Sequence, residues 1–116
     1  MPDPNCIFCK IVSGEIESDI VHQDARIVAF RDTNPQAPTH VLVVPRRHVP
    51  TINDLTETDA EDVGRLYLVA ADIAKREGVD QSGYRVLMNC MEGAGQSVFH
   101  IHLHLLGGRP FHWPPG

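Results

Sequence analysis

The stretch Phe99-His100-Ile101-His102-Leu103-His104-Leu105-Leu106 carries most of the information on how this sequence folds. Successive side chains of a β-strand point to opposite faces, so the three histidines are expected to share one face. Ile101, Leu103 and Leu105 then share the other face, and their apolar character assigns that face to a core. Neighbouring histidines on such a strand lie roughly 6.5–7 Å apart. Three imidazoles at strict alternation indicate a functional strand rather than scattered surface histidines.

The loop Glu92-Gly93-Ala94-Gly95-Gln96-Ser97 directly precedes these histidines. Glycine allows the backbone to approach a phosphate closely, and successive N–H groups can form an anion-binding nest. Gln96 and Ser97 add uncharged hydrogen-bond donors. The loop is not a Walker loop, which must open a helix and carry Gly-Lys-Ser/Thr. Together with the histidines it favours nucleotide chemistry, although a plain hairpin turn would use the same glycines.

One long helix is predicted after Thr56 or Thr58 and ends at Gly78. Thr58-Asp59-Ala60-Glu61 fits a capping box, and acidic residues in the first turn complement the helix dipole. One apolar stripe follows at helical spacing, made of Val63, Leu66, Tyr67, Ala70, Ile73 and Ala74. This stripe predicts a helix that packs one face against a sheet.

Five short segments have the pattern of strands: residues 19–22, 26–31, 41–44, 84–89 and 99–106. Apolar residues at helical spacing predict a short helix over Cys6–Val12, which Gly14 ends. The three prolines of residues 110–116 exclude a further strand. The expected fold is a single α+β domain over residues 1–116, in which one main helix and a short N-terminal helix accompany an antiparallel sheet of about five strands.

The composition excludes several classes of function. The chain has 116 residues and a formal net charge of −5, which argues against a protein that binds long nucleic acid. No apolar run approaches the length of a membrane span, so no membrane partner is expected. The first five residues contain no basic region followed by an apolar stretch, which predicts a cytoplasmic protein without a secretory signal.

Three blocks of the sequence resemble the histidine-triad (HIT) family of nucleotide hydrolases and transferases. The first is the run 96–106, Gln-Ser-Val-Phe-His-Ile-His-Leu-His-Leu-Leu, and the second is the run 32–40, Asp-Thr-Asn-Pro-Gln-Ala-Pro-Thr-His. The ending, Gly107-Gly108-Arg109 followed by His-Trp-Pro-Pro-Gly at 112–116, is similar to the branch that acts on purine nucleoside phosphoramidates. The resemblance covers almost the whole chain. It implies a HIT-like fold and a homodimer whose two sheets join into one.

The resemblance also implies roles for the residues of the catalytic strand. His102 matches the nucleophile, which is nucleotidylated and then hydrolysed. A neutral imidazole suits this role, because one nitrogen can attack phosphorus while the other donates to a carbonyl oxygen. His104 matches the histidine beside the phosphate, and His40 matches a histidine that supports the triad and relays a proton. Ser97 and Gln96 match residues beside the leaving group.

A purine nucleotide site follows from the same resemblance. Asp32 matches the carboxylate that accepts the two ribose hydroxyls, as suits an acceptor-only group. Asn89 matches a contact to phosphate or ribose, and four apolar residues are placed to line the base, although ordinary core packing would also account for them. The implied nucleotide-binding residues are Phe8, Ile11, Phe30, Asp32, Thr33, Leu42, Asn89, Gly95, Gln96, Ser97, His102 and His104.

The three cysteines, Cys6, Cys9 and Cys90, do not suggest a disulfide framework, because their number is odd and no signal peptide is visible. The Cys6-x-x-Cys9 pair needs two more ligands to form a closed zinc site. The resemblance implies that His48 and His100 supply them and that the zinc is structural. The alternative is a reduced, metal-free pair packed in the N-terminal helix.

The expected function is therefore hydrolysis at the α-phosphate of a purine nucleotide conjugate, with no catalytic metal. Two alternatives are open at this point. One is a zinc-dependent hydrolase that uses the strand histidines; against it, no carboxylate is evident near the triad to serve as a general base. The other is a nucleotide-binding adaptor whose turnover is incidental. The natural leaving group and the choice between adenosine and guanosine are open as well.

Overall fold

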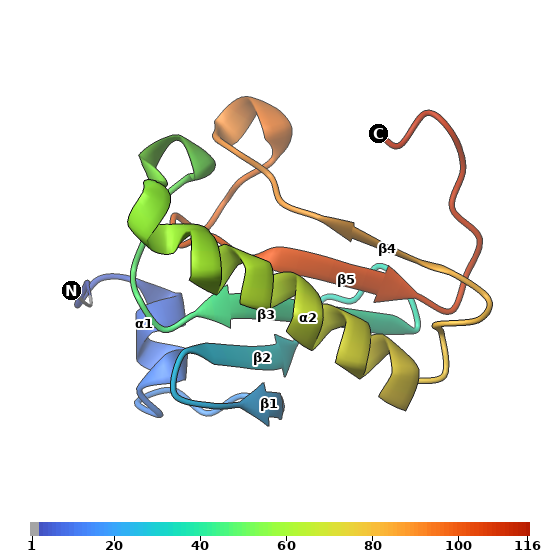
Figure 1. Cartoon of the computed structure of the whole chain (residues 1–116), viewed down its shortest axis with the longest axis horizontal. Coiled ribbons are helices and arrows are strands. Elements are labelled where there is room, and N and C mark those ends of the chain that lie inside the picture. Colours follow the sequence, from blue (N-terminus) through green and yellow to red (C-terminus); the bar gives the residue numbers. More distant parts are fainter. Residues whose placement is uncertain (1–2) are drawn as a thin grey trace.

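The computed structural model describes residues 3–116, which form one five-stranded sheet with two helices (Figure 1). The strands run in the order β1-β2-β3-β5-β4, and every neighbouring pair is antiparallel. The elements in chain order are α1 (Ile7–Val12), β1 (Ile20–Gln23), β2 (Ile27–Arg31), β3 (Thr39–Pro45), α2 (Ala60–Arg76), β4 (Tyr84–Leu87) and β5 (Leu103–Gly107). Short 3-10 turns lie at Ile52–Asp54, Glu57–Asp59 and Glu92–Ala94. The predicted α+β class, the five strands and the two helices are confirmed.

The helix α2 crosses one face of the sheet and covers the main core (Figure 1). Four of the six predicted stripe residues, Leu66, Ala70, Ile73 and Ala74, are buried as the helical spacing predicted. The prediction is wrong for Tyr67, which is 50% exposed, because the buried face of the helix is narrower than the predicted stripe; Val63 is only partly buried. The four buried residues pack with alternate residues of β2, β3 and β5, which include Ile27, Ala29, Val41, Val43, Leu103 and Leu105. The expected assignment of Leu103 and Leu105 to the core face is therefore correct.

A second, smaller core lies on the opposite face, under α1. Residues of β2 and β3 that alternate with those of the main core belong to it, namely Val28, Phe30, Leu42 and Val44. They pack against Cys6, Phe8 and Cys9 of the α1 segment. Because β3 contributes to both cores, all seven of its residues are buried. The functional side chains lie on this second face.

Some element boundaries differ from the predicted ones. The strand β5 begins at Leu103, so His100 and His102 lie in an irregular segment before it rather than within it. The strand β4 ends at Leu87, which leaves Asn89 beyond its end. The capping box is formed by Thr56 and Asp59 rather than by Thr58 and Glu61: the Thr56 amide donates to the Asp59 carboxylate over 3.0 Å. A short 3-10 turn therefore precedes α2.

Within residues 3–116, neither helix has the length and apolar character that crossing a membrane requires.

Candidate functional site

A cavity of about 360 Å³ opens between α1 and the second face of the sheet. It brings together residues from two of the three blocks that the sequence singled out, 32–40 and 96–106, whereas the ending 107–116 does not line it. Phe8 and Ile11 come from α1, and the histidines come from the segment around the start of β5. The predicted residues that line it are Phe8, Ile11, Phe30, Asp32, Thr33, Leu42, Ser97, His102 and His104. The cavity thus has an apolar wall and a polar end that carries two histidines and a carboxylate.

Three predicted nucleotide contacts, Asn89, Gly95 and Gln96, are not among the residues that line this cavity. The side chain of Gln96 is buried and bonded to backbone groups. Its Oε1 accepts from the Met91 amide over 2.7 Å, and its Nε2 donates to the carbonyl oxygens of Pro50 and Val98 over 2.8 and 3.1 Å. In this structure Gln96 therefore holds the loop that carries Ser97.

Sequence reasoning missed six residues of the cavity wall: Ile7, Ile16, Glu17, Ser18, Arg31 and Val98. Arg31 and Val98 adjoin predicted residues in sequence, so their positions could have been inferred. Residues 16–18 belong to the connection between α1 and β1 and carry no recognisable motif. Only the path of that connection across the sheet places them at the cavity.

The imidazole of His102 has its two nitrogens in different environments. Its Nδ1–H donates to the carbonyl oxygen of His100 over 2.8 Å, so in the neutral ring Nε2 carries the lone pair. Burial lowers the pKa of His102, while its hydrogen bond to the His100 carbonyl and the charge of Asp32 act in the opposite direction. The ring is therefore neutral near pH 7, and Nε2 is available as a nucleophile or base.

His40 and His104 form a hydrogen-bonded chain beside His102. The Gln36 amide donates to Nδ1 of His40 over 3.0 Å, which assigns the His40 proton to Nε2. This Nε2–H donates to Nδ1 of His104 over 2.9 Å, so His104 carries its own proton on Nε2. Burial, with the neighbouring His102 and His40, lowers the pKa of His104 to about 4. The neutral His104 therefore offers Nε2–H as a donor, next to the Nε2 lone pair of the neutral His102. The centroids of the two rings are 4.9 Å apart.

Asp32 corrects the expectation that no carboxylate lies near the histidines. Its Oδ2 is 3.4 Å from Nε2 of His40, and its Oδ1 accepts from the Asn34 amide over 2.8 Å. Asp32, His40 and His104 place three potential metal ligands within 4.8 Å of one another. The donor set does not fit a metal, however, because Nε2 of His40 carries the proton and its Nδ1 already accepts from the Gln36 amide.

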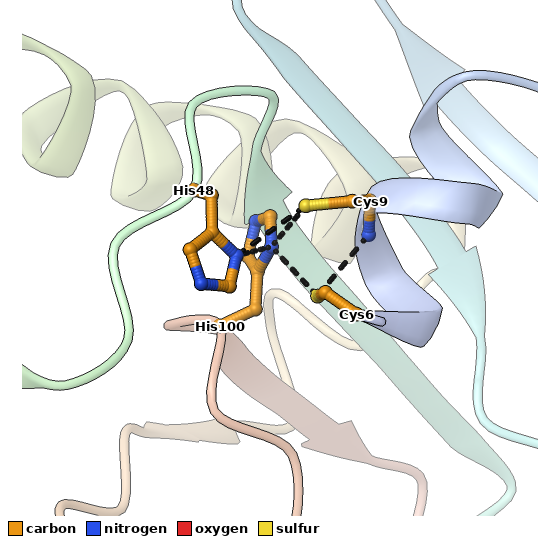
Figure 2. A group of neighbouring side chains, drawn as sticks. All are labelled: Cys6, Cys9, His48 and His100. Carbon is orange, nitrogen blue, oxygen red and sulfur yellow. Dashed lines mark hydrogen bonds between the residues drawn. The ribbon is translucent and has the colours of Figure 1, made fainter. Parts of the chain in front are cut away.

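The second group of potential ligands is formed by Cys6, Cys9, His48 and His100 (Figure 2). Their four ligand atoms lie within 4.8 Å of one another and come from the α1 segment, the loop after β3 and the segment before β5. The Nδ1 atoms of His48 and His100 are 3.3 Å apart. Nδ1 of His100 lies 3.4 Å from Sγ of Cys6 and 3.5 Å from Sγ of Cys9, and Nδ1 of His48 lies 3.3 Å from Sγ of Cys9.

These separations fit a tetrahedral zinc ion. At ordinary Zn–N and Zn–S bond lengths, a tetrahedral ion holds two nitrogens about 3.3 Å apart and a nitrogen and a sulfur about 3.6 Å apart. Nε2–H of His100 donates to the Pro45 carbonyl over 2.7 Å, which leaves the Nδ1 lone pair directed at the centre of the group. Burial raises the pKa of the Cys6 thiol, so a thiolate there needs a cation to compensate it. The group is therefore compatible with a structural zinc.

Comparison with known proteins identifies several relatives. The HIT domain model matches residues 13–111. The purine nucleoside phosphoramidase of Escherichia coli K12 is 53% identical over 104 residues, which are 90% of this chain and 87% of that protein. The 14 kDa zinc-binding protein of Zea mays is 46% identical over 118 residues and covers all of this chain and 91% of its own. A HIT family hydrolase of Legionella pneumophila Philadelphia 1 superposes with a TM-score of 0.95 and 51% identity, over 97% of this chain and all of that one.

Proposed function

The chain belongs to the HIT domain family, and we propose that it hydrolyses purine nucleoside phosphoramidates or related nucleotides at the α-phosphate, through a nucleotidyl-His102 intermediate. That it is a HIT-family hydrolase follows from its relatives. The phosphoramidase activity is proposed because a relative of that name shares 53% identity with it. The observation that carries the proposed mechanism is the Nδ1–H bond from His102 to the His100 carbonyl, which leaves Nε2 free to attack.

In the first step, Nε2 of His102 attacks the α-phosphorus. The new bond joins nitrogen and phosphorus, and the bond between phosphorus and the leaving amine breaks with its electron pair going to the amine. The amine must take up a proton as it departs, and we assign its delivery to the Ser97 hydroxyl because Ser97 lines the cavity. Nε2–H of His104 donates to a phosphate oxygen, where negative charge accumulates.

In the second step, water attacks the same phosphorus, the bond to His102 breaks with its electron pair returning to Nε2, and the proton that the water loses restores the Ser97 hydroxyl. The products are the nucleoside monophosphate and a neutral His102, so that over both steps one water is consumed and one amine is released. His40 supports this step through its hydrogen bond to His104. Splitting one displacement into two lets His102 attack in line with the leaving amine in the first step, and lets water attack in line with His102 in the second.

Recognition of the nucleoside uses the rest of the cavity. The Asp32 carboxylate accepts from the ribose hydroxyls, since it lies at the polar end beside His104. Phe8, Ile11, Phe30 and Leu42 form the apolar wall against which a purine base packs. Thr33 lies at the same cavity. Gln96 shapes the loop before the histidines through its bonds to the backbone of Met91, Pro50 and Val98. Direct contacts from Asn89, Gly95 and Gln96 to the nucleotide stay predictions.

A structural zinc ion and a second copy of the chain complete the proposed protein. The zinc is held by Cys6, Cys9, His48 and His100, and it joins the N-terminal segment to the sheet. The sheet has two edge strands, β1 and β4, and we assign the dimer to β4, where one row of backbone groups is available to a second chain. We propose the cytoplasm as its location.

The test is a search for the covalent adduct. Intact-protein mass is measured within the first turnover of an adenosine phosphoramidate, for wild type, His102→Ala and the control His22→Ala. Wild type and the control should gain one nucleoside monophosphate unit, and His102→Ala should gain none and lose about 10³-fold or more in kcat/KM. Turnover by wild type without a covalent adduct would instead favour a zinc-dependent hydrolase. An adduct-free protein that binds AMP without turning it over would favour an adaptor.

A further inference from the structure

The metal-ligand group and the catalytic cavity share one residue, His100. Its side chain is fully buried, with Nδ1 facing Sγ of Cys6 and of Cys9 (Figure 2). Its backbone carbonyl oxygen accepts the Nδ1–H of His102 over 2.8 Å. The position of that carbonyl determines which His102 nitrogen carries the proton and where the ring points. A single peptide unit therefore lies between the ligand group and the proposed nucleophile.

Phe8 provides a second connection between the two sites. It lies between Cys6 and Cys9 in sequence, and its ring is buried. The ring packs edge-on against His102, with centroids 5.0 Å apart and planes at 88°, and it also contacts His100 at 6.0 Å. The residue that touches the nucleophile is thus carried on the helix that holds both cysteines.

Neither connection is held by an element that is stable by itself. Residues 99–102 precede β5 and belong to no strand, so no continuous sheet ladder fixes the His100 carbonyl. The amide of Ile101 donates to the Val49 carbonyl over 2.8 Å, and Nε2–H of His100 donates to Pro45. The helix α1 has only six residues, too few to be stable without tertiary contacts. Both α1 and residues 99–102 therefore depend on tertiary contacts to hold their positions. The two segments meet at the group formed by Cys6, Cys9, His48 and His100.

We propose that the metal centre of Cys6, Cys9, His48 and His100 positions the nucleophile, through the carbonyl of His100 and the ring of Phe8. A bound metal ion ties α1 to His100, so it fixes the tautomer and the orientation of His102. Without the ion, α1 and the 99–102 segment move independently and His102 samples other orientations. Phe8 and His100 are positioning residues in this scheme, and the inference rests on the proposed role of His102 as nucleophile.

The experiment compares Cys9→Ser with Cys90→Ser, a matched cysteine variant outside the ligand group. Three quantities are measured: zinc per chain, the tautomer of His102 by ¹⁵N NMR of histidine-labelled protein, and kcat and KM separately. Cys90→Ser should keep one zinc per chain, the Nδ1–H tautomer and wild-type kcat. Cys9→Ser should lose the zinc, populate both tautomers, and lose about 10- to 100-fold in kcat, as outer-shell changes commonly do.

A second variant covers the case in which Cys9→Ser does not fold. Phe8→Leu keeps all four ligands and an apolar side chain, so zinc should be retained while kcat falls by several-fold and the His102 signal broadens. Zinc loss with an unchanged His102 tautomer and kcat within twofold of wild type would overturn the proposal, as would a wild-type kcat in Phe8→Leu.

The same series separates this inference from the proposed function. His102→Ala is assayed beside the other variants. Full activity in His102→Ala would refute the nucleophile assignment, and with it both proposals. Loss of activity in His102→Ala, together with an unaltered His102 in zinc-free Cys9→Ser, would refute only the coupling.

Discussion

At the scale of single residues, the site depends on where three imidazole protons lie. The Gln36 amide assigns the His40 proton to Nε2, and this proton in turn assigns that of His104 to Nε2. The His100 carbonyl assigns the His102 proton to Nδ1. The two histidines at the cavity therefore present opposite hydrogen-bonding roles, a donor on Nε2 of His104 and a lone pair on Nε2 of His102. A phosphate between them would meet a nucleophile on one side and a hydrogen-bond donor on the other.

The buried His104 makes folding stability depend on pH. Its folded-state pKa of about 4 lies below the ordinary value of 6.5, so the unfolded chain binds more protons between these two values. The folded state therefore has its full stability above pH 6.5, where His104 is neutral in both states. It loses stability as the pH falls toward 4, because the unfolded chain then takes up a proton that the buried ring does not. We expect the free energy of unfolding to fall by about 2 kcal/mol between pH 7.5 and pH 5 from this residue alone. Urea unfolding at both pH values measures the change.

The matched variant is His104→Gln, which keeps a polar side chain but does not titrate in this range. Its stability loss between pH 7.5 and pH 5 should be smaller than that of wild type by the contribution of His104. Acid effects on the metal ligands are common to both proteins and cancel in the difference. Identical pH slopes for the two proteins would contradict a depressed His104 pKa.

At the scale of elements, the two faces of the sheet have separate tasks. The helix α2 buries an apolar stripe on one face, and this stripe closes the main core against the strands. The helix α1 covers the other face only partly, and the cavity opens beside it. The strand β3 is buried on both faces, so it connects the main core under α2 with the smaller core under α1. Stability and chemistry are thus supplied by opposite faces of the same strands.

Shortening a side chain in the α2 stripe should destabilise the fold without altering the site. Leu66 is fully buried, and Leu66→Ala should lower the free energy of unfolding by about 3 kcal/mol, since it leaves a cavity in the main core. The exposed neighbour Arg65 is the control, and Arg65→Ala should change stability by less than about 0.5 kcal/mol. Denaturant unfolding measures both. An equal effect of the two substitutions would contradict the assignment of the stripe.

At the scale of the whole molecule, the strand order leaves β4 at one edge of the sheet. The helix α2 also exposes two large apolar side chains, Tyr67 at 50% and Leu68 at 70% of their surface. An unpaired edge and exposed apolar residues are both features of surfaces that another chain covers. They support the proposed homodimer, in which two five-stranded sheets become one.

The dimer can be tested by sedimentation equilibrium. Wild type should sediment with the mass of two chains, and Leu68→Glu should shift toward one chain because a carboxylate is costly to bury at an interface. Ile52→Glu, an equivalent change at an exposed apolar residue outside α2 and β4, should leave the mass at two chains. A one-chain mass for wild type at micromolar concentration would rule the dimer out.

Periodicity along the sequence was sufficient for the α+β class, the stripe of α2 and the core face of β5, because the face on which a side chain lies is a local property of the backbone. The alternating histidines and the Cys6-x-x-Cys9 pair were visible in the sequence, and the family resemblance implied the full ligand group and the catalytic roles. The tertiary structure alone decided that β5 begins only at Leu103, that Gln96 bonds to the backbone, and that residues 16–18 line the cavity.

Contacts distant in sequence account for this difference. Cys6 and His100 are separated by 94 positions, and the irregular segment before β5 follows its course because His100 is anchored beside the cysteines and to the Pro45 carbonyl. No window of the sequence contains both partners. The sequence by itself determined which histidines share a face, and its family resemblance implied that His100 joins the cysteines. Only the tertiary structure decided how the segment before β5 turns so that His100 lies beside the cysteines while His102 and His104 line the cavity, because each side chain's partner is supplied by a different part of the chain.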